Sequence, residues 1–191
     1  MTAARSSMTG RSGAVFLVGF MGAGKSSVGR LLARKLGRCF IETDDMIVAR
    51  EGRSIPEIFA TQGEAHFREA ELEAVRLLAL KRGDVIATGG GLPCREGVPE
   101  ALRALGTVVW LAGDFAALYE RARRARDDRP MLASRSRAEV EALYRAREPY
   151  YRQADITVDT TALGPDQVAT RVALALAERR SASGAARAAG A

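Results

Sequence analysis

The chain has 191 residues, the size of one ordinary domain, of which 47% are hydrophobic and 27% are charged. This balance is typical of globular proteins, and no apolar run approaches the ~20 residues of a membrane-spanning helix, which excludes an integral membrane protein of that kind. The net charge of +6 comes mostly from arginine and suits either nucleic acid or small anionic ligands. Two cysteines and one histidine are too few for a structural zinc site.

The two ends of the chain differ in composition from its middle. Residues 1–12 contain serine and arginine without an apolar core, which predicts a flexible extension rather than a secretory signal. Residues 181–191 are alanine, glycine, serine and arginine, which predicts a disordered tail. We expect one domain, 13–180, between them. Without an export signal the cysteines should be reduced thiols, which predicts a cytoplasmic protein with no membrane partner.

Short apolar runs alternate with amphipathic segments along the chain. In order, the patterns predict a strand at 14–19, a helix at 26–36, a strand at 38–43, helices at 45–50, 55–59 and 64–81, a strand at 84–88, a helix at 101–105, a strand at 107–111, helices at 114–124 and 137–151, a strand at 155–159 and a helix at 165–179. Asp114 is expected to cap its helix and Trp110 to lie in the core. The alternation predicts a single-domain α/β fold with a five-stranded parallel sheet and helices on both faces.

The strongest motif follows the first strand. Gly19-Phe-Met-Gly-Ala-Gly24-Lys25-Ser26 matches the G-x-x-x-x-G-K-[ST] phosphate loop between a strand and a helix. Backbone N–H groups and the helix N-terminus attract phosphate, Lys25 reaches the β- and γ-phosphates, and Ser26 holds Mg²⁺. We therefore predict a nucleoside triphosphate with Mg²⁺ as cofactor and Lys25 as a catalytic group. The predicted nucleotide-binding residues are Gly22, Ala23, Gly24, Lys25, Ser26 and Ser27.

Together with this loop, five later segments resemble the shikimate kinase family. They are Phe40-Ile-Glu-Thr-Asp44, Gly63-Glu64-Ala-His-Phe-Arg68-Glu-Ala-Glu71, Gly89-Gly90-Gly91, Arg129-Pro130-Met-Leu132 and Arg147-Glu-Pro-Tyr150-Tyr151. Each is weakly specific alone, but all five occur in the family's order, and the resemblance runs from about residue 14 to about residue 178. It implies a P-loop kinase, a monomer, that transfers the γ-phosphoryl group of ATP to the 3-hydroxyl of shikimate in aromatic amino acid biosynthesis.

The resemblance also implies roles on the acceptor side. Arg68 and Arg147 would bind the shikimate carboxylate, for which the planar guanidinium fork is suited. Asp44 would bind the hydroxyls and accept the proton of the attacked one. Gly89, Gly90 and Gly91 would let the backbone approach the substrate closely.

These residues also have purely structural interpretations. Arg68 could form only solvated pairs with Glu64 and Glu71, which in the functional interpretation orient it. Asp44 and Asp45 could be helix caps, and Asp45 is the expected cap. The three glycines could form a simple turn.

Arginines gather in a predicted lid at about 121–137. No aromatic residue lies among them and no DNA-binding motif accompanies them, so we predict no nucleic-acid partner. Arg129 before Pro130 matches the family's lid arginine, which implies ATP binding and a catalytic role at the γ-phosphate. Which arginine contacts adenine stays open among Arg121, Arg123 and Arg124.

Three departures from the family pattern and three rival functions remain. Glu42 stands where the family usually has aspartate, Ser27 stands where threonine is common, and the loop at 159–165 lacks the arginine often found beside adenine. Another small P-loop kinase, such as a gluconate kinase, would share the loop but bind a different acceptor. A nucleotide-binding regulatory module would bind without turnover. A nucleic-acid-binding ATPase would need acidic residues after a strand, where the third strand runs into glycines.

Overall fold

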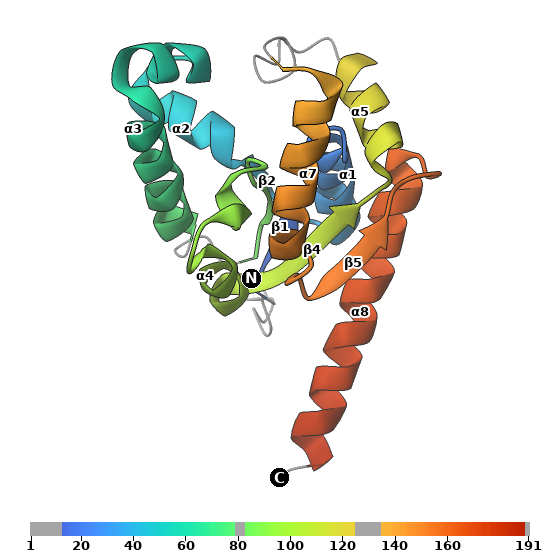
Figure 1. The fold of residues 1–191 in the computed structure, drawn as a ribbon. Coiled ribbons are helices and arrows are strands. Elements are labelled where there is room, and N and C mark those ends of the chain that lie inside the picture. The colour runs from blue at the N-terminus through green and yellow to red at the C-terminus, as the bar shows by residue number, and fades with distance from the viewer. Residues whose placement is uncertain (1–12, 79–82, 125–134, 190–191) are drawn as a thin grey trace, which may run out of the picture.

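The computed structural model describes residues 13–78, 83–124 and 135–189 (Figure 1). The strands are β1 (Ala14–Val18), β2 (Phe40–Glu42), β3 (Val85–Ala87), β4 (Gly106–Ala112) and β5 (Ile156–Asp159). The α-helices are α1 (Lys25–Leu36), α2 (Thr43–Glu51), α3 (Ile55–Leu78), α4 (Val98–Leu105), α5 (Phe115–Arg124), α7 (Arg137–Tyr151) and α8 (Pro165–Ala189), and η1 (Leu92–Cys94) is a short 3-10 helix.

The five strands form one parallel sheet in the order β2-β3-β1-β4-β5. The chain leaves the central strand β1 toward β2 and β3 on one side and then crosses to β4 and β5 on the other. Every residue of β1 and β3 is buried, as expected for parallel strands covered on both faces. The predicted fold class is confirmed, and the carboxyl ends of the central strands form the edge where such sheets bind ligands.

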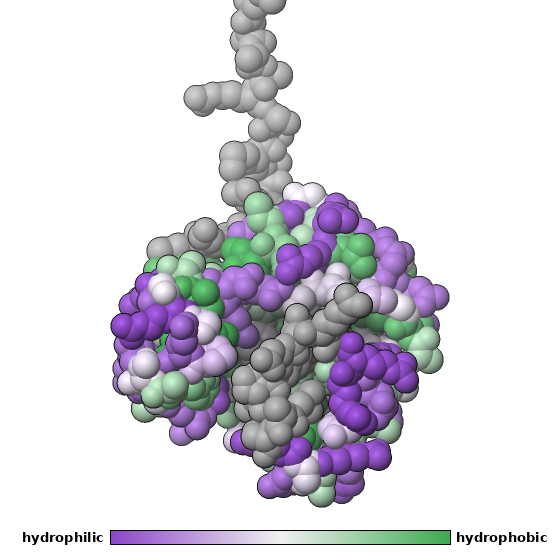
Figure 2. All heavy atoms as spheres, turned by 90° about the horizontal axis from the view of Figure 1, so that it is seen from above, coloured by the Kyte–Doolittle hydropathy of each residue, from purple (hydrophilic) through white to green (hydrophobic). Residues whose placement is uncertain are grey.

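Helices cover the sheet on both faces. Figure 1 shows α4 and α7 in front of the sheet and α1 behind it, where α1 packs against α8. The main core joins the strands to these helices and contains Trp110 of β4, which is 6% exposed, as predicted. Seen from above, onto the end of the molecule where the strands terminate, hydrophilic side chains dominate the described surface (Figure 2).

Helices α2 and α3 form a separate body at the β2 side of the sheet (Figure 1). They share a small apolar cluster of their own, made by Ile47, Ile58, Phe67, Ala70 and Ala74. The two helices predicted at 55–59 and 64–81 are halves of α3, which has non-helical backbone at Gly63 with φ 80°. Glycine tolerates this positive φ, so the axis can bend there. The second half of α3 carries Arg68 toward the sheet.

The structure corrects two local predictions and confirms one. Asp45 is not a helix cap, because α2 begins at Thr43 directly after β2 and places Asp45 inside its first turn. Helix α8 does not end at Arg179 but continues to Ala189, because alanine and arginine favour helix. Asp114 does cap α5, since its Oδ2 accepts from the backbone N–H of Ala116 at 3.0 Å.

Candidate active site

The phosphate loop joins β1 to α1 and is shaped by glycines. Gly24 has φ 85° and is the N-cap residue of α1, so no side chain occupies the first N–H groups of that helix. The Nζ of Lys25 donates to the carbonyls of Gly19 at 2.8 Å and Phe20 at 3.1 Å, which folds the lysine back over the loop. Ser26 and Ser27 are exposed in the first turn. This arrangement suits an anion at the helix N-terminus.

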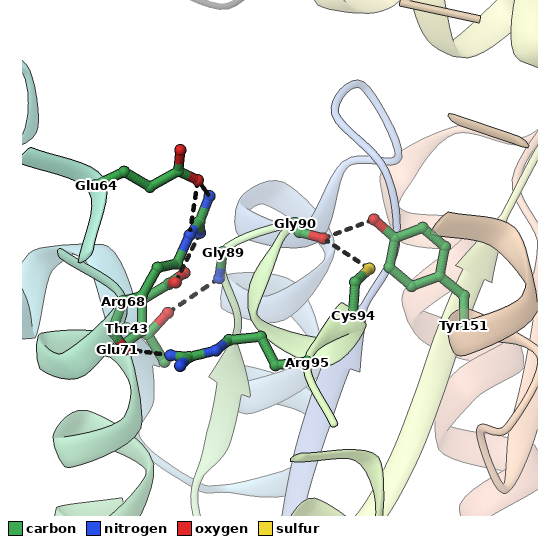
Figure 3. Close-up of polar contacts among 9 residues, drawn as sticks. All are labelled: Thr43, Glu64, Arg68, Glu71, Gly89, Gly90, Cys94, Arg95 and Tyr151. Atoms are coloured by element: carbon green, nitrogen blue, oxygen red, sulfur yellow. Dashed lines mark hydrogen bonds and ion pairs between the residues drawn. The ribbon is translucent and has the colours of Figure 1, made fainter. Parts of the chain in front are cut away.

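The glycine loop after β3 is fixed by side chains from two other elements (Figure 3). The N–H of Gly89 donates to Oγ1 of Thr43 at 3.0 Å, and the hydroxyl of Tyr151 donates to the carbonyl of Gly90 at 2.7 Å. Thr43 begins α2 and Tyr151 ends α7, and both are buried. The loop is therefore a rigid junction between the α2–α3 body and α7, and not a simple flexible turn.

The two predicted acceptor arginines converge on this loop. A Cβ placed on Gly91 would lie 2.9 Å from Nη1 of Arg68 and 3.3 Å from Nη2 of Arg147. Any side chain at Gly91 would therefore collide with at least one guanidinium group. Arg68 comes from α3 and Arg147 from α7, so the fold brings together two cations that are distant in sequence. Two guanidinium groups facing one point form a binding place for a carboxylate.

Arg68 also makes both of the ion pairs that the sequence suggested. Its Nη1 donates to Oε2 of Glu71 at 2.7 Å, and its Nη2 and Nε donate to Oε1 of Glu64 at 2.8 and 3.1 Å. The two interpretations of Arg68 are thus compatible, because the glutamates hold its guanidinium at Gly91. Burial raises the pKa of Glu71, the Arg68 pair lowers it, and the charge of Asp44 raises it further.

Asp44 lies against the same glycine loop. Its Oδ1 would be 2.9 Å from a Cβ on Gly89, and Oε1 of Glu71 would be 3.1 Å from it. Among the described residues, this Oδ1 is a buried atom without a hydrogen-bond partner. Burial raises the pKa of Asp44, while the nearby charge of Lys25 lowers it. A buried carboxyl group with a raised pKa and an open oxygen is suited to accept a proton.

Helix α7 connects this acceptor side to the phosphate loop. Tyr144 packs edge-on against Phe20 of the loop with ring centroids 5.3 Å apart, and Tyr151 holds Gly90. Of the other arginines here, Arg145 pairs with Glu141 inside the helix, Arg152 just after it pairs with Glu148, and Arg137 lies over the ring of Tyr119. Arg147 differs from them because it points toward Gly90 and Gly91.

Sequence reasoning missed several residues that shape the site. Thr43, Tyr151 and Arg95 had no assigned role, yet each fixes the glycine loop or Arg68. Arg95 follows η1 and donates to the backbone carbonyl of Arg68 (Figure 3). The position of Thr43 directly before Asp44 was the one available signal, because a residue at the end of a parallel strand lies at the ligand edge.

The departures noted in the sequence now have a structural setting. Glu42, at the family's usual aspartate position, pairs with Arg30 at 3.0 Å. In the loop after β5, the carbonyls of Thr160 and Thr161 each accept from Nη2 of Arg121 at 2.6 Å. An arginine from α5 thus contacts the loop that lacks one of its own. Arg129 and Pro130 lie outside the described residues.

A parallel α/β sheet with a phosphate loop after its central strand defines the P-loop class of nucleotide-binding proteins. Residues 21–177 match the family described as shikimate kinase. A shikimate kinase from Moorella thermoacetica is 47% identical over 86% of this chain and 94% of its own length. The chain belongs to the shikimate kinase family, and it is accordingly an ATP-dependent kinase.

Solved structures agree with this membership. The shikimate kinase from Acinetobacter baumannii in complex with shikimate has a TM-score of 0.82 at 33% identity, covering 88% of this chain and 94% of that one. The enzyme from Aquifex aeolicus has a TM-score of 0.78 at 36% identity, covering 87% and 98%. Within the described residues, no helix has both the length and the apolar character to cross a membrane.

Proposed function

We propose that the protein transfers the γ-phosphoryl group of ATP to the 3-hydroxyl of shikimate, forming shikimate 3-phosphate and ADP. The observation that carries this proposal is the convergence of Arg68 and Arg147 on Gly91, beside the partly buried Asp44 and its buried Oδ1. Two guanidinium groups suit a carboxylate, and a buried carboxyl group suits the hydroxyls at the other end of the acceptor. A relative with the same fold binds shikimate.

In the proposed reaction the 3-hydroxyl attacks the γ-phosphorus while the bond to the β-phosphate oxygen breaks and ADP leaves. Asp44 accepts the proton of the attacking hydroxyl, for which its raised pKa is favourable. Lys25 gives up the Gly19 and Phe20 carbonyls and donates to the β- and γ-phosphates. Arg129 would add charge at the γ-phosphate, a role that rests on its match to the family's motif.

The residues of the phosphate loop fit Mg²⁺. Ser26 presents an exposed hydroxyl in the first turn of α1, beside helix N–H groups that no side chain caps. Mg²⁺ takes oxygen ligands and binds chiefly through substrate phosphates with one or two protein groups, so Ser26 and the phosphates would hold it. Bound with ATP, the ion neutralises phosphate charge.

Arg121 is the proposed adenine-side arginine. It contacts the loop after β5 through Thr160 and Thr161, whereas Arg123 pairs with Glu120 at 3.7 Å on the exposed side of α5. The monomeric state, the cytoplasmic location and the absence of a nucleic-acid partner stay predictions from the sequence.

A coupled assay of ADP release tests the proposal. The protein is incubated with ATP and Mg²⁺ and with shikimate, quinate, gluconate or no acceptor. We expect release that depends on shikimate. Release that depends on gluconate alone would keep the phosphate-loop assignment and refute shikimate as the acceptor, and nucleotide binding without release would indicate a regulatory protein.

A further inference from the structure

Arg68 is held by two carboxylates of different character. Glu71 accepts a hydrogen bond from Nη1 of Arg68, and the glutamate side chain is 1% exposed. Glu64 accepts hydrogen bonds from Nε and Nη2 of Arg68, and the Glu64 side chain is 67% exposed. Figure 3 shows Glu64 reaching the guanidinium group from outside, with the glycine loop beside it. The first contact is a permanent part of the interior, and the second can exchange with solvent.

Glu64 occupies the edge of Arg68 that an acceptor carboxylate needs. A guanidinium group binds a carboxylate best through two adjacent N–H groups. Glu71 accepts from one N–H of Nη1, and Oε1 of Glu64 accepts from Nε and Nη2, the adjacent pair on the other edge. An acceptor carboxylate pairs with that edge only when Glu64 gives it up.

A second cation of the acceptor site also acts on Glu64. Its pKa is lowered first by the hydrogen bond and charge of Arg68, and further by the charges of Arg135 and Arg147. Glu64 is therefore a carboxylate within the field of both arginines that converge on Gly91.

We propose that Glu64 is an internal competitor of the substrate: its carboxylate occupies the acceptor-carboxylate position on Arg68 and is displaced when the acceptor binds. The inference rests on the proposed function, because it needs an acceptor whose carboxylate binds Arg68. Displacement is easy, since an exposed pair one helical turn apart is weak. Glu64 is thus a specificity-determining residue, because an acceptor that lacks a carboxylate has nothing to exchange for it.

The proposal predicts a gain of affinity on removing a charge from the site. Glu64→Gln keeps the length of the side chain and removes its charge, so shikimate no longer competes with an anion. We expect its dissociation constant to fall by about two- to fivefold, the range of an exposed ion pair. Calorimetric titration of shikimate without nucleotide measures this binding separately from turnover.

The control is Glu73→Gln, on the same helix and with the same change of charge. Glu73 pairs with Arg76 at 3.4 Å and Arg50 at 4.0 Å, and no contact joins it to Arg68. It should leave the dissociation constant unchanged. The methyl ester of shikimate should gain nothing from Glu64→Gln.

Three results would overturn the proposal. Equal or weaker binding of shikimate by Glu64→Gln would mean that Glu64 only orients Arg68. An equal gain of affinity for shikimate in Glu73→Gln would mean that the effect comes from overall charge. An equal gain of affinity for the methyl ester in Glu64→Gln would exclude competition between carboxylates. A wild-type protein that does not bind shikimate at all would instead refute the proposed function, and the inference with it.

Discussion

The phosphate loop and the acceptor site lie at the same edge of the sheet but are built in opposite ways. The loop is eight consecutive residues whose backbone N–H groups are the proposed phosphate ligands, and its lysine donates to carbonyls of the same loop. The acceptor site takes charged side chains from α2, α3 and α7 and sets them against three glycines. Backbone sites are local and self-contained, whereas side-chain sites need further residues to hold each charge.

The two regions also differ in how they affect the free energy of unfolding. Asp44 is a partly buried residue whose buried Oδ1 lacks a hydrogen-bond partner, and burial raises its pKa. Burying such a group opposes folding by about 1–3 kcal/mol. We expect substitutions in the phosphate loop to act mainly on turnover and substitutions on the acceptor side to act on turnover and stability together.

The largest expected effect is in the phosphate loop. Lys25→Ala should lower kcat at least about 100-fold, because a charge that stabilises the transition state is lost. The melting temperature should fall only modestly, because the variant loses the part-buried hydrogen bonds of Lys25 to the Gly19 and Phe20 carbonyls. Steady-state assay and thermal unfolding measure both, with Lys35→Ala as control, whose lysine pairs with Asp166 of α8. Near-normal turnover would contradict the mechanism.

Asp44→Asn should separate activity from stability. Turnover should fall about 100-fold, because the proton acceptor is lost. Since the pKa of Asp44 is raised in the folded state, the folded protein keeps this proton to higher pH than the unfolded chain does. The cost of the ionised carboxylate to the stability of the fold is therefore complete above the raised pKa. The variant should therefore be more stable at pH 7.5 by about 1 kcal/mol, or about 2–4 °C in melting temperature.

The pH dependence gives the same prediction a second readout. Between the ordinary aspartate pKa and the raised value, wild-type stability should fall as pH rises, and Asp44→Asn should lose that component. Asp45→Asn, an exposed neighbour in the same helical turn, is the control: it should leave turnover unchanged and reduce the pH-dependent component only in part, because its charge is one of the smaller causes that raise the pKa of Asp44. A less stable Asp44→Asn protein would show that the carboxylate is well satisfied in the fold.

Arg68→Lys tests the planar, two-pronged geometry of the guanidinium group and keeps a positive charge to pair with Glu71. Lysine cannot present two parallel N–H groups, so KM for shikimate should rise at least about 10-fold while KM for ATP stays constant. Arg76→Lys on the same helix should have no effect. An unchanged KM for shikimate in Arg68→Lys would refute the carboxylate role.

The smallest effect is expected at Tyr151. Tyr151→Phe removes the hydroxyl that holds Gly90, so the free energy of unfolding should fall by about 1–2 kcal/mol. KM for shikimate should rise about threefold or more, because the loop under both arginines loosens, and KM for ATP should not change. Tyr150→Phe, whose side chain is exposed, is the control. Equal changes in the KM values for shikimate and ATP would mean that Tyr151 contributes to the packing of the whole domain and not to the glycine loop in particular.

These two regions also explain how much the sequence could predict. The alternation of strands and helices and the phosphate loop are local patterns, and the fold and the loop followed from them. The role of Tyr151 could not be predicted, and that of Thr43 was signalled only by its place before Asp44, because both depend on hydrogen bonds to a loop that is distant in sequence. The prediction that Asp45 caps its helix was wrong, because the sequence pattern does not show that α2 starts directly at the end of β2.

The central claim is the identity of the acceptor and of the hydroxyl that receives the phosphate. Nuclear magnetic resonance of the products formed from ATP, Mg²⁺ and shikimate tests both at once. The account predicts a single phosphorylated product, with phosphorus coupled to the proton on carbon 3 of shikimate. Phosphate on another hydroxyl, or ADP formation without phosphorylated shikimate, would contradict it.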